Sequence, residues 1–309
     1  MSSNIVQGYA SLGSRSRVLA GRSRSGRRPA RRPSRDVSLD SLRRGFELFR
    51  KEVWKYWKEN GRHDLPWRKT SDPYKILVSE IMLQQTQVDR VVPYYKNFLV
   101  EFPSVKALAR ASLFDVLRLW SGLGYNRRAK YLRDAATQIV EVHGGKVPRD
   151  YESLRSLPGV GDYTARAVRS FVFNEPEILI ETNIRTAFIH RLFSGIPSVS
   201  DRTIKEQAER EAKGQDPRQW HWALMDYGAH LKRSGVRNNR KSLHYVRQSK
   251  FEGSSRQLRG VIVRLLQKRQ NPMRSDPIGF STRKRTELAL RSLARDGLVA
   301  NKKGGWQIA

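Results

Sequence analysis

The sequence of 309 residues contains no cysteine. This absence excludes disulfide bonds, cysteine nucleophiles, and zinc or iron–sulfur sites that depend on thiolate ligands. Long apolar runs are also missing, and no stretch of about 18 apolar residues occurs, so the sequence predicts no transmembrane helix. The lack of cysteine is typical of a reducing compartment, and we therefore expect a cytoplasmic protein.

Acidic residues are scarce beside basic ones. The chain carries 60 Lys and Arg against 29 Asp and Glu, a formal net charge of +31. Such an excess favours a polyanionic partner, most often a nucleic acid. The 6 histidines are scattered. They form no His-x-x-x-His or His-Glu-x-x-His pattern, so the sequence predicts no metal site.

Residues 1–36 differ in composition from the rest. They contain nine arginines, no lysine and, before Asp36, no acidic residue. Such a segment buries too little apolar surface to offset its ordering entropy, so we expect a disordered arm. The arm either binds phosphates or is a solvated tail. Organellar targeting is a further interpretation, because the segment is rich in Arg and Ser and free of acids.

Two ordered domains are expected after the arm. Residues 37–245 show apolar residues at helical spacing between Gly- and Pro-marked breaks, which predicts an all-α, two-lobed domain. One lobe is expected to hold six helices over about 66–180, and the other to combine 37–65 with 181–245. In 246–309, two helical segments precede Gly297 and a short hairpin, which favours a winged helix that either binds DNA or only packs.

A glycine-containing hairpin opens one of the predicted helices. Its residues are Pro158, Gly159, Val160 and Gly161. A hairpin of this kind leaves backbone N–H groups close to the surface at a helix N-terminus, where they can bind a phosphate. The pattern indicates a grip on a DNA backbone that does not read bases.

Two glutamates are candidate catalytic groups. Glu80 stands alone in an apolar run, where burial would raise its pKa and make it a proton donor; otherwise it points at water. Glu181 follows an apolar triplet. In one interpretation Glu181 is an acid at the N-terminus of a helix that the Thr182-Asn183 pair caps. In the other, its carboxylate faces the same cleft as Glu80. Two carboxyls across a cleft would permit cleavage of a glycosidic bond.

Together these motifs resemble the helix–hairpin–helix DNA glycosylase superfamily, and within it the adenine DNA glycosylases that act on A/G mispairs. The resemblance runs from about His63 to Ala229. It is carried by Leu65-Pro66-Trp67-Arg68, Ser79-Glu80-Ile81-Met82-Leu83-Gln84-Gln85-Thr86-Gln87, Leu119-Trp120-Ser121-Gly122-Leu123-Gly124-Tyr125, the Pro158–Gly161 hairpin and Met225-Asp226-Tyr227-Gly228-Ala229.

The resemblance implies a role for each matching residue. Glu80 would protonate the adenine ring nitrogen, and Glu181 stands at the place of the second acid. DNA contacts would come from the hairpin, from Gln84, Gln85 and Thr86, with Gln85 as the wedge that replaces the flipped base, and from Tyr125 beside the opposite guanine. The base pocket would include His63, Leu65, Trp67, Arg68 and Asp226. Tyr163 stands where bifunctional relatives carry a Schiff-base lysine, which implies no lyase step.

Three departures from the family pattern stand out. The second acid is a Glu rather than an Asp, which could displace its carboxylate by about an angstrom. The usual four-cysteine iron–sulfur cluster is impossible, with Lys232 at the place of the first cysteine, and we expect no other cofactor. The residues after about 250 are too few for the domain with which the family senses oxidised guanine.

Three functions remain open. The first is a monofunctional adenine glycosylase acting on A opposite G or oxidised G in double-stranded DNA. The second is a thymine or uracil glycosylase acting on T:G or U:G mispairs. The third is a non-catalytic duplex-binding protein. In each case we expect a nucleoid-associated monomer, by analogy with the family.

Overall fold

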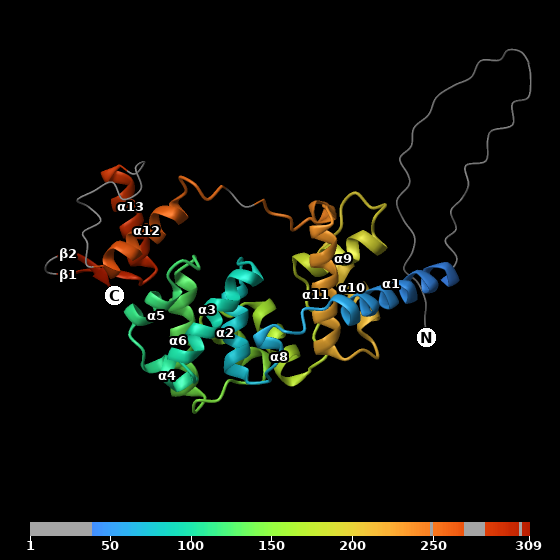
Figure 1. The fold of residues 1–309 in the computed structure, drawn as a ribbon, viewed down its shortest axis with the longest axis horizontal. Helices are drawn as coiled ribbons and strands as arrows, with labels where there is room; N and C mark the ends of the chain where they lie inside the picture. The colour runs from blue at the N-terminus through green and yellow to red at the C-terminus, as the bar shows by residue number, and fades with distance from the viewer. Residues whose placement is uncertain (1–38, 248–249, 269–281, 303–304) are drawn as a thin grey trace, which may run out of the picture. The chain divides into compact units, whose positions relative to one another are not determined.

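The computed structural model describes residues 39–247, 250–268, 282–302 and 305–309, with side chains from Gly45 onward. The predicted arm over 1–36 lies outside the described residues. One compact unit spans Asp40–Ala309. Figure 1 shows that this unit is built almost entirely of helices.

The segment predicted as the first lobe has seven α-helices. They are preceded by the 3-10 helix η1 (Pro66–Arg68) and are α2 (Pro73–Leu83), α3 (Val88–Glu101), α4 (Val105–Arg110), α5 (Leu113–Trp120), α6 (Arg127–Val142), α7 (Tyr151–Ser156) and α8 (Asp162–Phe173). The sequence predicts six helices between residues 66 and 180, and the structure describes every residue of this range. The count exceeds the expected one because α4 and α7, of six residues each, are short enough to be overlooked. Each is preceded by an N-cap, Ser104 or Asp150, whose side chain accepts a backbone N–H group.

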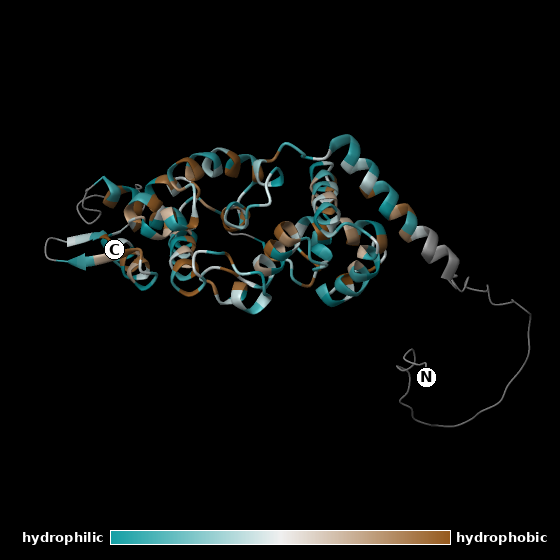
Figure 2. Cartoon of the chain, turned by 90° about the horizontal axis from the view of Figure 1, so that it is seen from below, coloured by the Kyte–Doolittle hydropathy of each residue, from teal (hydrophilic) through white to brown (hydrophobic). Residues whose placement is uncertain are grey.

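The second lobe brings the first described helix next to a later segment of the chain. Its helices are α1 (Leu39–Asn60), α9 (Thr182–Leu192), α10 (Asp201–Ala212) and α11 (Pro217–Arg233), followed by the 3-10 helix η2 (Asn238–Lys241). Phe49 of α1 packs edge-on against Phe188 of α9 and Trp220 of α11, with ring centroids 5.2 and 6.3 Å apart. Figure 2 shows hydrophobic and hydrophilic residues along the same helices, as expected of amphipathic elements.

The C-terminal segment forms two helices and a hairpin. They are α12 (Ser255–Gln267), α13 (Arg283–Arg295), β1 (Val299–Lys302) and β2 (Gly305–Ile308), and the strands pair antiparallel with Val299 opposite Ile308. Gly297 ends α13 with φ of +67°, the left-handed conformation expected for it. Helix, helix and hairpin therefore follow in the expected order, while assignment to the winged-helix class stays a prediction.

In the described ranges, no helix combines the length and the apolar character needed to cross a membrane.

Candidate active site

Glu80 lies on α2 in apolar surroundings. Only 7% of its surface is exposed, and its neighbours Val78, Ile81 and Met82 are buried with it. Burial and, to a lesser extent, the nearby charge of Glu181 raise the pKa of its carboxyl to about 8, against the lowering effect of Arg68. Glu80 is therefore protonated at neutral pH, which is the state that a proton donor needs.

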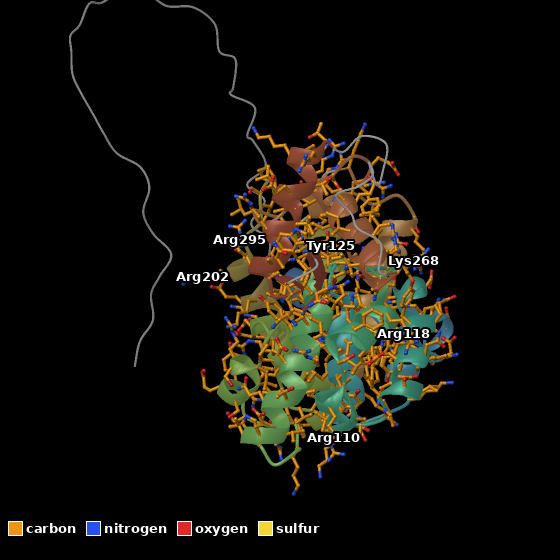
Figure 3. The ribbon with its side chains drawn as sticks, turned by 90° about the vertical axis from the view of Figure 1, so that its left-hand side faces the viewer. Arg110, Arg118, Tyr125, Arg202, Lys268 and Arg295 are labelled. Carbon is orange, nitrogen blue, oxygen red and sulfur yellow. The ribbon has the colours of Figure 1, made fainter. Side chains whose placement is uncertain are left out.

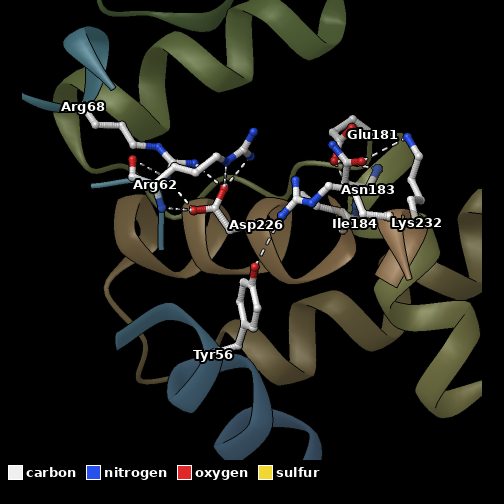
Figure 4. Close-up of polar contacts among 9 residues, drawn as sticks. Tyr56, Arg62, Arg68, Glu181, Asn183, Ile184, Asp226 and Lys232 are labelled. Carbon is white, nitrogen blue, oxygen red and sulfur yellow. Dashed lines mark hydrogen bonds and ion pairs between the residues drawn. The ribbon is translucent and has the colours of Figure 1, made fainter. Parts of the chain in front are cut away.

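Glu181 occupies the N-cap of α9. Its Oε1 atom accepts hydrogen bonds from the backbone N–H groups of Asn183 and Ile184, each at 2.8 Å, as Figure 4 shows. The expectation that the Thr182-Asn183 pair would cap this helix is wrong, because Glu181 itself supplies the acceptor. Burial raises the pKa of Glu181 above its ordinary value, and the two N–H donors and the cations of Lys232 and Arg185 oppose this rise without cancelling it.

Tyr163 completes a group of three side chains. It lies in the first turn of α8, and its pKa is raised well above 10 by burial, then by the charges of Glu80 and Glu181. The charge of each glutamate therefore acts on the Tyr163 phenol. Glu80, Glu181 and Tyr163 come from three helices and influence one another electrostatically, and the phenol keeps its proton.

Asp226 forms the centre of a buried ion-pair network. Its Oδ2 accepts the backbone N–H of Arg62 at 2.8 Å and Nη1 of Arg68 at 2.7 Å, while Oδ1 accepts Nε of Arg62 and Nη2 of Arg68 (Figure 4). The Arg68 guanidinium lies over the rings of Trp57 and Trp222, 5.1 and 5.4 Å from their centroids. Both oxygens of Asp226 are thus engaged, and they hold Arg68 in a fixed orientation near Glu80.

The other residues expected in the base pocket lie at or beside the core. Leu65 and Trp67 are buried, and Trp67 packs edge-on against Tyr95 at 5.4 Å. His63 contacts the carbonyl oxygen of Trp57 through Nε2 at 2.8 Å. Of the five residues expected in the pocket, the structure joins Arg68 and Asp226 directly, and the other three support the surrounding segment.

The predicted DNA-contacting turns meet each other in the first lobe. Gln84 follows α2, and its Nε2 donates to the carbonyl of Gly159 in the hairpin at 3.2 Å and to Thr164 at 3.3 Å. Gln85 and Tyr125 both have left-handed backbones, with φ of 56° and 51°. Strained non-glycine residues of this kind concentrate at functional sites, because the surrounding structure must hold them.

Arg128 is a functional candidate that the sequence analysis missed. Its Nη1 donates to the carbonyls of Ile81, Met82 and Gln84 at 2.6–2.9 Å, and its Nη2 donates to Thr86 and Gly124. Burial lowers its pKa to about 10. This one cation therefore joins the end of α2, the Gln84–Thr86 turn and the Tyr125 loop. The sequence does not distinguish Arg128 from Arg127 beside it, whose side chain is largely exposed.

A groove of about 1150 Å³ runs along these turns. One wall carries Gln85 and Tyr125, and the other comes from α12 and α13 of the C-terminal segment. Arg256 of α12 donates to the Tyr125 hydroxyl at 2.6 Å and lies over its ring. Figure 3 shows Tyr125 where the C-terminal helices meet the first lobe, with Arg295 and Lys268 extending from nearby helices. The C-terminal helices are thus part of the groove.

The segment after α11 cannot hold an iron–sulfur cluster. Such a cluster needs thiolate ligands, and the chain has none. Backbone pairing closes this segment instead: the Val199 N–H donates to the carbonyl of Lys241 at 2.8 Å, and the Leu243 N–H donates to the carbonyl of Val199 at 3.0 Å. Across the described part of the chain, no three His, Asp or Glu side chains gather as metal ligands do.

Comparisons with known proteins agree with this architecture. Residues 78–215 match the family described as HhH-GPD superfamily base excision DNA repair protein. The adenine DNA glycosylase of Mycolicibacterium smegmatis is 33% identical over 269 residues, covering 81% of this chain and 92% of that protein. That of Mycobacterium tuberculosis is 34% identical over 275 residues, covering 81% and 90%.

A solved structure supports the same assignment. A thermostable thymine-DNA glycosylase superposes with a TM-score of 0.56 at 29% identity, covering 62% of this chain and 88% of that one. The match confirms the predicted helical glycosylase fold. Because a relative at 33% identity is covered over nine-tenths of its length, the chain belongs to the adenine DNA glycosylase family of the helix–hairpin–helix base excision repair superfamily.

Proposed function

We propose that this chain is a monofunctional DNA glycosylase that removes adenine mispaired with guanine or oxidised guanine. The observation that carries the proposal is the burial of Glu80, whose pKa is raised to about 8 by that burial and by the charge of Glu181. The activity in the names of the mycobacterial relatives supports the choice of base. The net charge of +31 supports double-stranded DNA as the partner of a nucleoid-associated monomer.

The two carboxyls take different parts in the reaction. Glu80 donates its proton to a ring nitrogen of the flipped adenine, which makes the base a better leaving group. The glycosidic bond then breaks, its electron pair leaves with the adenine, and positive charge develops on the sugar. Glu181 stabilises that charge as a carboxylate, and water completes the hydrolysis at the anomeric carbon. The products are free adenine and an abasic site.

Tyr163 supports a mechanism without strand cleavage. A lyase step requires an amine that attacks the sugar and forms a Schiff base. The phenol at this position stays protonated, since its pKa is raised well above 10, and it has no nitrogen. We therefore propose that the strand stays intact after the base has left, and that no metal or other cofactor takes part.

Binding of the duplex is assigned to the turns around Arg128. The hairpin N–H groups bind a phosphate, Gln85 fills the space of the flipped base, and Tyr125 lies beside the opposite base. The strained backbones of Gln85 and Tyr125 are held in place before DNA binds, so less ordering of the protein is required on binding.

The decisive experiment measures single-turnover base release from duplexes that carry A opposite oxidised guanine, A opposite G, T opposite G, and U opposite G. Each reaction is run with and without alkali, with Glu80→Gln as the inactive control. We expect adenine release that depends on Glu80 and strand breaks only after alkali. Breaks without alkali would contradict the monofunctional mechanism. Tight binding without any release would favour a non-catalytic duplex-binding protein.

A second candidate function is removal of thymine or uracil opposite guanine. The likeness to a thymine-DNA glycosylase at 29% identity favours it, and so does the Glu at position 181 in place of Asp. Competition between A:G and T:G duplexes in one reaction separates the two candidates. Faster release of thymine would reverse our order of preference.

A further inference from the structure

We propose that Lys232 of α11 is a positioning residue for Glu181, keeping its carboxylate ionised and oriented through Asn183. This inference rests on the proposed function, since it assigns the support of the second acid. Lys232 is an exposed residue in the last turn of α11, and its basic side chain can serve the neighbouring carboxylate.

The first argument is a chain of hydrogen bonds. The Nζ atom of Lys232 donates to Oδ1 of Asn183 at 3.2 Å, and the backbone N–H of Asn183 donates to Oε1 of Glu181 at 2.8 Å. Figure 4 shows the three residues side by side, with Lys232 on the helix that also carries Asp226. Asn183 therefore connects the cation to the carboxylate, and its side chain is fixed on one side by Lys232.

The second argument is the close packing of α11 against the start of α9. A Cβ atom on Gly228 would lie 2.0 Å from the carbonyl oxygen of Asn183, so only glycine permits this approach. Lys232 comes four residues after Gly228, on the same face of α11. The close contact at Gly228 therefore delivers the Lys232 side chain to the N-cap that Glu181 occupies.

The third argument is the balance of charge around Glu181. The groups that face it are Glu80 of α2, Tyr163 of α8, Arg185 of α9 and Lys232 of α11. Glu80 is protonated at neutral pH and Tyr163 is neutral. Arg185 forms a bidentate ion pair with Asp201, at 2.7 and 2.6 Å, which offsets its charge. Lys232 instead contacts a neutral amide oxygen, so its positive charge remains available to Glu181.

The test compares Lys232→Gln and Lys232→Arg with the unaltered full-length protein. Lys205→Gln is the matched control, an exposed lysine on α10 that pairs with Glu209. Carboxyl signals of glutamate labelled with ¹³C are followed by NMR from pH 4 to 9, and Glu181→Gln identifies the signal of Glu181. This readout needs no catalysis, so it stays informative even if the proposed function fails. The acid limb of single-turnover base release is then measured for the same proteins.

We expect Lys232→Gln to raise the pKa of Glu181 by about 0.5 unit, a modest shift because Lys232 is exposed and its charge is screened. The midpoint of the acid limb of base release should rise by the same amount, which lowers the rate about threefold at pH values on that limb. Lys232→Arg should restore both values, and Lys205→Gln should change neither. An unchanged Glu181 titration in Lys232→Gln, or a loss that arginine does not restore, would overturn the inference. A lower melting temperature with an unchanged pH profile would do the same, because it indicates a structural role.

Discussion

Glu80 and Glu181 carry the same functional group in two different surroundings. Glu80 lies in the last turn of α2, three residues before Leu83, among buried apolar side chains. Glu181 lies at the N-terminus of α9, where two backbone N–H groups point at its oxygen and the helix dipole favours negative charge. The pKa of each is raised by burial, but only that of Glu181 is lowered by directed hydrogen bonds.

The difference shows how a helical fold separates an acid from a base with one residue type. The last turn of a helix has no free N–H groups, so a carboxyl there keeps its proton when it is buried. A helix N-terminus has free N–H groups, and a carboxyl there is stabilised as an anion. The backbone position of each glutamate therefore assigns its part in the proposed reaction.

Replacing Glu80 by Gln should have the largest effect. The amide keeps the shape but has no acidic proton, so single-turnover base release should fall by about 10²- to 10⁴-fold. Duplex affinity, measured by fluorescence anisotropy, should stay the same. Glu206→Gln, on the exposed face of α10, is the control. Near-normal release by Glu80→Gln would remove Glu80 as the proton donor.

Replacing Glu181 by Gln tests the other half of the comparison. The amide oxygen can still accept from Asn183 and Ile184, so the cap on α9 should survive while the negative charge is lost. We expect base release to fall by about 10²-fold, the usual cost of one electrostatic contact to a transition state. Circular dichroism checks that the helix content is kept. A rate equal to that of the unaltered protein would make Glu181 a structural cap alone.

Replacing Glu181 by Asp asks whether the longer side chain is required. Asp is an excellent N-cap, so stability should hardly change. Its carboxylate would lie about an angstrom farther from the position that Glu181 provides, and we expect base release to fall about tenfold. Faster release than in the unaltered protein would mean instead that Glu181 is badly placed for catalysis.

The smallest effect concerns stability and pH. Folding raises the pKa of Glu80 from its ordinary 4.5 to about 8, so the folded state holds this proton more tightly than the unfolded chain does. Stability from this group is complete below pH 4.5 and is lost as pH rises towards 8. Glu80→Gln should therefore melt several degrees above the unaltered protein at pH 9, with the gap narrowing towards pH 5. Equal melting curves at pH 9 would contradict the shifted pKa.

Much of this arrangement follows from local sequence patterns. The apolar run around Glu80 predicts both its helix and its burial, because apolar neighbours at helical spacing leave the carboxyl little water. Gly297 predicts the end of α13, since glycine adopts a left-handed conformation without strain. The hairpin at Gly159 can likewise be predicted from its residues.

Other parts required the structure, because they depend on contacts between distant segments. The cap at Glu181 was assigned to its neighbours, since Asn and Thr are the commoner capping residues. The pairing of Asp226 with Arg62 and Arg68 joins residues more than 150 positions apart. The groove wall supplied by α12 could not be predicted either, because nothing in a surface arginine such as Arg256 indicates which helix it will face.

The position of Arg128 has a consequence for how the two strained turns respond to change. One guanidinium bonds to Gln84 and Thr86 on either side of Gln85, and it also lies 5.4 Å from the ring centroid of Tyr125. Gln85 and Tyr125 therefore share a common support. Energies of substitution at sites that share a partner do not add, so a double-mutant cycle of Gln85→Ala with Tyr125→Ala should give a non-zero interaction free energy. In duplex binding, the two residues would then act as one thermodynamic unit, with a single side chain setting the coupling between them.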